Sequence, residues 1–146
     1  INLGGTEDDQ LIHQLNSKLD DPIVLISEPD AKKAKQIICS SGAVFSSRYH
    51  GCVSALSQGI PCIGTSWSHK YETLYDAYDA TELLIKPDIL NKDLRSLITL
   101  SIERRHLLTL KLHERSDRQQ QKSTAMWEHL NRVLAQYPYF ETHSRQ

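Results

Sequence analysis

Between residues 20 and 90 the chain alternates short apolar runs with segments of helical periodicity, and few folds fit this pattern. The runs are rich in β-branched residues, as buried parallel strands are. They lie at 22–26, 43–46, 61–64 and 82–85, and the helical segments lie at about 30–41, 50–58 and 68–77. Strands that alternate with helices across short loops predict an α/β fold with a doubly wound, Rossmann-like parallel sheet and right-handed crossovers.

Helical patterns flank this region on both sides. Apolar residues fall on one face of a predicted helix from Thr6 to about Leu19. After Pro87, leucines at helical spacing predict one or two long helices within residues 91–136. We therefore expect residues 1–90 to form a half-domain and residues 91–137 to form helices that pack on it. Residues 138–146 are expected to be a flexible tail.

Composition excludes several classes of protein. The 17 basic and 18 acidic side chains give a net charge of −1, which argues against a nucleic-acid partner. Cys39, Cys52 and Cys62 lie in apolar stretches without zinc-ligand spacing, so we expect buried free thiols in a reducing compartment and no metal site. No apolar run is long enough to span a membrane. The chain starts without Met or a leader, so we expect an excised part of a longer, cytoplasmic protein.

The last third of the chain is mildly basic. Residues 91–146 carry 10 basic and 6 acidic side chains. Five of the basic residues follow helical spacing and predict a stripe on the terminal helices: Arg104, Lys111, Arg115, Arg118 and Lys122. Such a stripe allows a weak peripheral contact with an anionic membrane at its inner face. A solvated helix surface, or a contact with the amino-terminal half that lies outside this chain, is the simpler alternative.

Polar residues follow the predicted strand 43–46 without a gap. Ser47, Arg48, Tyr49, His50 and Gly51 lie where that strand ends and the next helix begins. Ligands of parallel sheets bind at this edge, and a helix start offers unpaired N–H groups to anions. Arg48 adds a planar fork suited to phosphate or carboxylate, and His50 can exchange a proton near neutral pH. The alternative is structural, with Arg48 in an ion pair and His50 capping the helix.

A second polar loop follows the next predicted strand, at residues 65–70. Lys70 lies in the first turn of a predicted helix, where a cation opposes the helix dipole, and such a placement often serves a ligand. Trp67 suits either a stacking wall for a sugar or a plug in the core. Since the two strands are expected to be neighbours, both loops should face one crevice.

The two loops together resemble the polysaccharide pyruvyl transferase family. The resemblance rests on the Arg48-Tyr49-His50-Gly51 turn, the helix exit at residues 55–61 and an aromatic residue three positions before Lys70. It covers about residues 36–86. It implies the carboxyl-terminal half of a GT-B-like two-domain enzyme whose amino-terminal domain lies outside this chain. Ser66-Trp67-Ser68-His69 departs from the family's usual Tyr-Asp-x, which leaves the acceptor open.

The resemblance also implies a reaction. Phosphoenolpyruvate would donate a pyruvyl group to a saccharide and form a ketal during surface polysaccharide synthesis, without a cofactor. Arg48 and Lys70 would match the family's donor-site cations, and His50 its histidine. The acceptor would be a saccharide, which could be linked to a lipid. Glu28 or Glu72 could supply the carboxylate that stabilises an oxocarbenium-like centre.

Two other functions stay open at the level of sequence. A nucleotide-sugar glycosyltransferase of the same architecture would need an acidic residue for the ribose, and Glu72 and Asp76 are the candidates. A non-catalytic interaction domain could keep an inherited pocket. For a transferase we expect the chain to fold alone without turning over, because a cleft enzyme needs groups from both of its walls.

Overall fold

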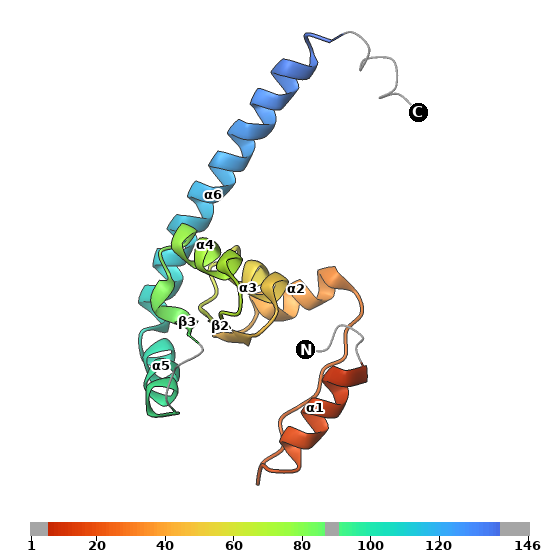
Figure 1. Ribbon diagram of the computed structural model, residues 1–146, viewed down its shortest axis with the longest axis vertical. Helices are drawn as coiled ribbons and strands as arrows, with labels where there is room; N and C mark the ends of the chain where they lie inside the picture. Colours follow the sequence, from red (N-terminus) through yellow and green to blue (C-terminus); the bar gives the residue numbers. More distant parts are fainter. Residues whose placement is uncertain (1–5, 87–90, 138–146) are drawn as a thin grey trace.

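The computed structural model describes residues 6–86 and 91–137 (Figure 1). Helices and short strands alternate in the first part, and two helices follow. In chain order the elements are α1 (Thr6–Asn16), α2 (Ala31–Cys39), β1 (Val44–Ser46), α3 (Tyr49–Leu56), β2 (Cys62–Thr65), α4 (His69–Ala77), the 3-10 turn η1 (Thr81–Leu83), β3 (Leu84–Ile85), α5 (Asn91–Glu103) and α6 (Arg105–Leu134).

The sheet has three parallel strands in the order β1-β2-β3. Val44 pairs with Cys62, and Gly64 lies between Ser46 on one side and Leu84 on the other. Helices α3 and α4 are the crossovers that parallel pairing requires. The predicted α/β class and parallel sheet are therefore confirmed. The described strand order follows the chain order without a reversal, so a doubly wound sheet stays a prediction.

The predicted strand at residues 22–26 is absent from the sheet. Ser27 makes an isolated bridge, but residues 22–26 are irregular, and Val24 is 85% exposed. The prediction was wrong because a β-branched apolar run forms a buried strand only where a neighbouring layer covers it. Asn16 instead holds this segment through two hydrogen bonds with the backbone of Ile23. Helix α1, red in Figure 1, lies apart from the sheet, and its apolar side chains are largely exposed.

The core lies where α3, α4 and the start of α6 meet the sheet. Its fully buried members include Leu56 from α3, Tyr71 and Tyr75 from α4, and Leu112 from α6. The Tyr75 hydroxyl donates to the backbone oxygen of Cys62, 3.0 Å away, so burial leaves this polar group paired. Burial raises the pKa of Tyr75, which keeps the phenol neutral. This core fixes both helices that follow β1 and β2.

The cysteines divide between core and surface. Cys52 and Cys62 are buried free thiols as predicted, but Cys39 is exposed because the last turn of α2 turns it to solvent. The hydrogen bond between the two buried thiols lowers the pKa of Cys52 to about 7. The same bond, together with burial, raises the pKa of Cys62.

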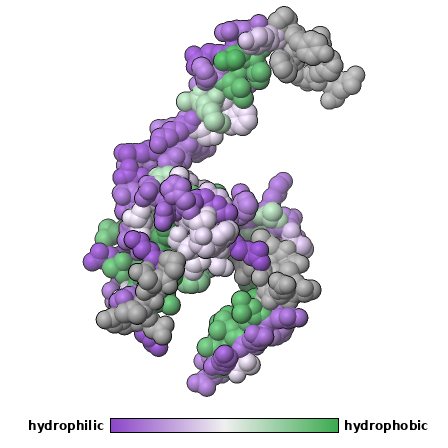
Figure 2. Space-filling model, viewed as in Figure 1, coloured by the Kyte–Doolittle hydropathy of each residue, from purple (hydrophilic) through white to green (hydrophobic). Residues whose placement is uncertain are grey.

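The predicted terminal helices are confirmed as two, α5 and α6, which meet at Arg104. The first half of α6 packs on the α/β unit through Leu108 and Leu112, and the Ser116 hydroxyl donates to Ser57 O at 2.7 Å. The second half projects beyond the unit (Figure 1). Figure 2 shows apolar surface on that projection and again over α1. The predicted tail at 138–146 lies outside the described residues.

Most of the predicted basic residues on α6 form salt bridges within the chain. Lys111 lies 3.3 Å from Asp79 and from Glu82, and Arg115 lies 3.1 Å from Asp79. Arg118 pairs with Glu114 one turn earlier on α6. Three of the five cations therefore pair with carboxylates of this chain, an arrangement that the sequence did not predict. In the part of the chain described here, no helix is both long and apolar enough to cross a bilayer.

Candidate functional site

The two polar loops meet at one edge of the sheet. Because β1 and β2 are adjacent and parallel, their carboxyl ends point the same way. Helix α3 begins three residues after β1 ends, and α4 begins four residues after β2 ends. His50 and Lys70 are each the second residue of their helix, so they occupy equivalent places in successive units. The fold thus brings the two loops together, as the sequence predicted.

Ser46 shapes the first loop. Its hydroxyl accepts from the Arg48 backbone N–H at 3.1 Å and donates to the Arg48 carbonyl at 3.0 Å, which closes a tight turn. A side chain at Gly51 would collide with the Ser46 hydroxyl. Local packing therefore requires a glycine at this position. Ser46 itself was missed, although a serine at a strand end before a helix is a known signal for such turns.

The structural alternative for this loop is wrong in one part. Arg48 is the N-cap of α3, and its side chain makes no capping hydrogen bond. His50 lies inside the first turn, so it does not cap the helix either. Its side chain is exposed at the start of α3. The first N–H groups of an α-helix have no acceptor in its regular pattern, but in α3 the Gly51 N–H donates to the Arg48 carbonyl at 3.0 Å. The N–H groups of Tyr49 and His50 precede it at this loop.

Tyr71 ties the second loop to the first. Its ring is fully buried, and its hydroxyl donates to the backbone oxygen of Ser47 at 2.9 Å. The ring also makes an edge contact with Tyr49, with centroids 5.4 Å apart. The sequence analysis did not single out Tyr71, because a tyrosine in a helix looks like any other core aromatic. Its hydroxyl bond across the two loops makes it a residue that sets their spacing.

Lys70 lies inside a group of aromatic rings. Its Nζ atom is 4.8 Å from the Trp67 ring, 4.9 Å from Tyr49 and 5.7 Å from Tyr71. Such contacts attract a cation through the negative faces of the rings, and here they offset its unfavourable place at a helix start. Within the described residues no carboxylate pairs with Lys70. Its charge is therefore held in position without being neutralised.

Trp67 is 67% exposed, so the core-plug alternative for this residue is wrong. Its ring tilts 59° against Tyr71, with centroids 5.6 Å apart. His69 beside it points to solvent and lies 3.2 Å from Glu72.

A cleft of about 970 Å³ opens at this edge. All the predicted site residues line it: Ser47, Arg48, Tyr49, His50, Gly51, Trp67 and Lys70. Apolar residues of α2 and β1, such as Ile38 and Phe45, continue it away from the loops. The charged groups on its wall are Lys35, Arg48 and Lys70, and no Asp or Glu of the described chain lines it. The cleft is therefore suited to an anionic ligand.

The two carboxylates suggested for the reaction do not reach this cleft. Glu28 accepts from the backbone N–H of Asp30 at 2.9 Å, just before α2. Glu72 is paired with His69 on the exposed side of α4. Neither is among the residues that line the cleft. Local hydrogen bonding explains both better than a role in catalysis.

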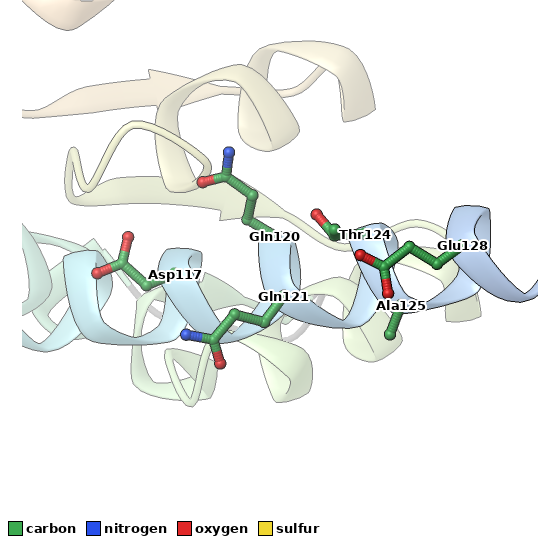
Figure 3. Close-up of a pocket in the computed structure, with 6 residues that line it drawn as sticks. All are labelled: Asp117, Gln120, Gln121, Thr124, Ala125 and Glu128. Carbon is green, nitrogen blue, oxygen red and sulfur yellow. The ribbon is translucent and has the colours of Figure 1, made fainter.

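A second hollow, of about 510 Å³, lies along α6 (Figure 3). All of its lining residues come from this one helix: Asp117, Gln120, Gln121, Thr124, Ala125 and Glu128. Since a single helix cannot enclose a ligand, and the charged members are acidic, this hollow does not match the anion site. The described residues contain no group of three His, Cys, Asp or Glu side chains placed to hold a metal ion.

Comparison with known proteins supports the resemblance found in the loops. A family model described as polysaccharide pyruvyl transferase matches residues 2–69. The match includes the Arg48-to-Gly51 turn and Trp67 and stops one residue before Lys70. No curated protein and no solved structure matches the chain. The resemblance is therefore confirmed over residues 2–69, which match the model of the polysaccharide pyruvyl transferase family.

Proposed function

We propose that this chain carries the donor-binding wall of an enzyme that transfers a pyruvyl group from phosphoenolpyruvate to a saccharide and so forms a ketal. One observation carries the proposal. Arg48 and Lys70 line one cleft with His50, and no carboxylate of the described chain lines it. The match of residues 2–69 to the polysaccharide pyruvyl transferase family also supports a transferase that acts in polysaccharide synthesis.

Phosphoenolpyruvate suits such a wall because it is small and carries two anionic groups. The guanidinium of Arg48 can bind phosphate or carboxylate through two parallel hydrogen bonds. The ammonium of Lys70 acts as a point charge whose position three rings fix. The first N–H groups of α3 and α4 add donors at the same edge. Binding one anion on each cation would orient the donor.

Ketal formation requires proton transfers that these cations cannot perform. Two sugar hydroxyls each form a bond to the carbon that carries the phosphate, and the bond from that carbon to the phosphate oxygen breaks. One of the two hydroxyl protons ends on the donor's methylene carbon, and the other leaves with phosphate. An imidazole can hold or release a proton near neutral pH, so we assign one of these transfers to His50. Its exposed position at the cleft fits contact with a ligand. A carboxylate that stabilises positive charge would come from the predicted amino-terminal half.

The geometry of the cleft does not support the alternative function, a nucleotide-sugar glycosyltransferase. Neither of its ribose candidates, Glu72 and Asp76, lines the cleft, and both are exposed on α4. The cations of the cleft could bind a diphosphate. However, no carboxylate of the described residues lines the cleft to bind the ribose. Measuring the binding of each donor distinguishes a nucleotide-sugar glycosyltransferase from a pyruvyl transferase and from a domain that binds neither donor.

Titration calorimetry with phosphoenolpyruvate, UDP and GDP tests the proposal. We expect phosphoenolpyruvate to bind, and Arg48→Ala to weaken it about tenfold to hundredfold, because a hydrogen bond to a charged group contributes about 1.5–3 kcal/mol. Arg48→Lys should recover only part of the loss, since an ammonium lacks the fork.

Arg118→Ala is the matched control, since it removes an arginine of α6 outside the cleft. It should leave donor binding unchanged. Tighter binding of UDP or GDP than of phosphoenolpyruvate would favour the glycosyltransferase. Equal loss in the Arg48 and Arg118 variants would remove the assignment of Arg48.

A further inference from the structure

Trp67 is an exposed aromatic residue whose position is nevertheless fixed. Its ring is 67% exposed at the cleft, although large apolar side chains are usually covered. Lys70 lies 4.8 Å from the ring, and the buried Tyr71 lies 5.6 Å from it. Two neighbours on α4 thus orient the indole before any ligand arrives, which lowers the entropy lost on binding.

The charge distribution of the ring limits what can cover it. An aromatic face is negative and its edge positive, so it attracts cations and C–H groups and does not favour an anion. Lys70 already uses this attraction. Phosphoenolpyruvate, with its phosphate and carboxylate, is a poor partner for the open part of the ring. A neutral ligand with an apolar face fits it better.

We propose that the exposed face of Trp67 is the subsite for the saccharide acceptor, and that a neutral pyranose stacks on it with its C–H-bearing face. This proposal rests on the proposed function and extends it. Lys70 then lies at the boundary between the two substrates, with its ammonium toward the donor and its position set by the acceptor platform. Tyr71 keeps the platform at a fixed distance from Ser47 in the donor loop.

The two tryptophans of the chain allow a direct test. Trp127, the other one, is on α6 and does not line the cleft, although it is 55% exposed. In Trp127→Phe all indole fluorescence comes from Trp67. The probes are methyl β-D-glucopyranoside, methyl β-D-galactopyranoside and methyl β-D-mannopyranoside. We expect at least one of them to shift and quench this fluorescence in a saturable way, and phosphoenolpyruvate to bind the same variant as it binds the unaltered chain.

Trp67→Phe, which leaves only Trp127, is the matched control and should show no such change. Trp67→Ala should weaken binding of the same glycoside about tenfold to hundredfold in ligand-observed NMR, as expected when a large apolar contact is lost. Its affinity for phosphoenolpyruvate should fall by much less than its affinity for the glycoside, because Tyr49 and Tyr71 still contact Lys70. A flat response of Trp127→Phe to all three glycosides, or equal glycoside binding by Trp67→Ala, would overturn the subsite. Failure of the unaltered chain to bind phosphoenolpyruvate would instead overturn the proposed donor site.

Discussion

At the scale of single residues, the candidate site repeats one arrangement twice. His50 and Lys70 each follow a strand of the sheet and occupy the second position of a helix. The repeat places a histidine and a lysine at one edge of the sheet, where both line the cleft. Around them, Ser46 and Tyr71 hold the backbone of the first loop by side-chain hydrogen bonds. The two proposed roles, proton transfer by His50 and anion binding by Lys70, therefore differ only in the residue type that occupies the second position of each helix.

His50→Gln tests this division. Glutamine keeps hydrogen bonding but cannot shuttle a proton, so single-turnover pyruvyl transfer should slow by about 10²–10⁴-fold. The assay needs an enzyme that contains both predicted halves. Donor affinity should change little, and the protein should stay folded because the side chain is exposed. Near-normal turnover in this variant would show that His50 has another role.

At the scale of elements, the packing of α6 decides how much of the terminal region belongs to the core. Leu108 and Leu112 belong to the same cluster as Leu56 and Tyr75, although Leu108 lies 52 positions after Leu56 in the chain. Farther along the helix, Trp127 and its apolar neighbours are exposed. The periodicity of α6 is the same in both halves, so periodicity alone does not distinguish a buried face from an open one.

Two leucines of α6 give a matched pair for this point. Leu112 is fully buried and Leu107 is 66% exposed. Leu112→Ala should lower the free energy of unfolding by about 2–5 kcal/mol, since it leaves a cavity in the core. Leu107→Ala should change it by less than about 0.5 kcal/mol, at the same cost in helix propensity. Chemical denaturation measures both, and equal losses would mean that α6 does not pack on the unit in solution.

At the scale of the whole molecule, one carboxylate joins the α/β unit to the terminal helix. Asp79 follows α4 with a φ of 51°, and it contacts both Lys111 and Arg115 of α6. The hydrogen bond from Lys111, and then that from Arg115, lowers the pKa of Asp79 below its ordinary value of 3.8.

The lowered pKa of Asp79 predicts how stability depends on pH. The stabilising contribution is present above the ordinary pKa and is lost as pH falls through the lowered value. Asp79→Asn removes the charge and tolerates the left-handed backbone. Thermal unfolding should therefore show a lower melting temperature for the variant at pH 7, and the gap should close below about pH 4.

Asp117→Asn is the control for this measurement. Asp117 is an exposed carboxylate of α6 that makes no salt bridge within the described residues. It should show no gap that depends on pH. If the gap for Asp79→Asn stayed constant over the same range, strain in the turn, and not the charge, would be its cause.

Local sequence pattern was enough to predict most of the elements and the residues of the candidate site. Strand and helix periods located β1, β2 and β3 with their helices, and adjacent parallel strands placed the polar loops at one edge. These features depend on local pattern and on chain connectivity, which the residues carry directly. The predicted site residues on both loops line the cleft for the same reason.

Only the tertiary structure decided which apolar faces are covered. Residues 22–26 were predicted to form a buried strand, but all of them except Leu25 are exposed. Trp67 suited either the core or a ligand site, and it is exposed. Lys111 and Arg115 were predicted to be surface charges, but both form salt bridges with Asp79. The Tyr71 hydroxyl reaches Ser47, 24 residues earlier. Burial and pairing depend on residues distant in the chain, because the free energy of an apolar or charged side chain is set by its neighbours in space.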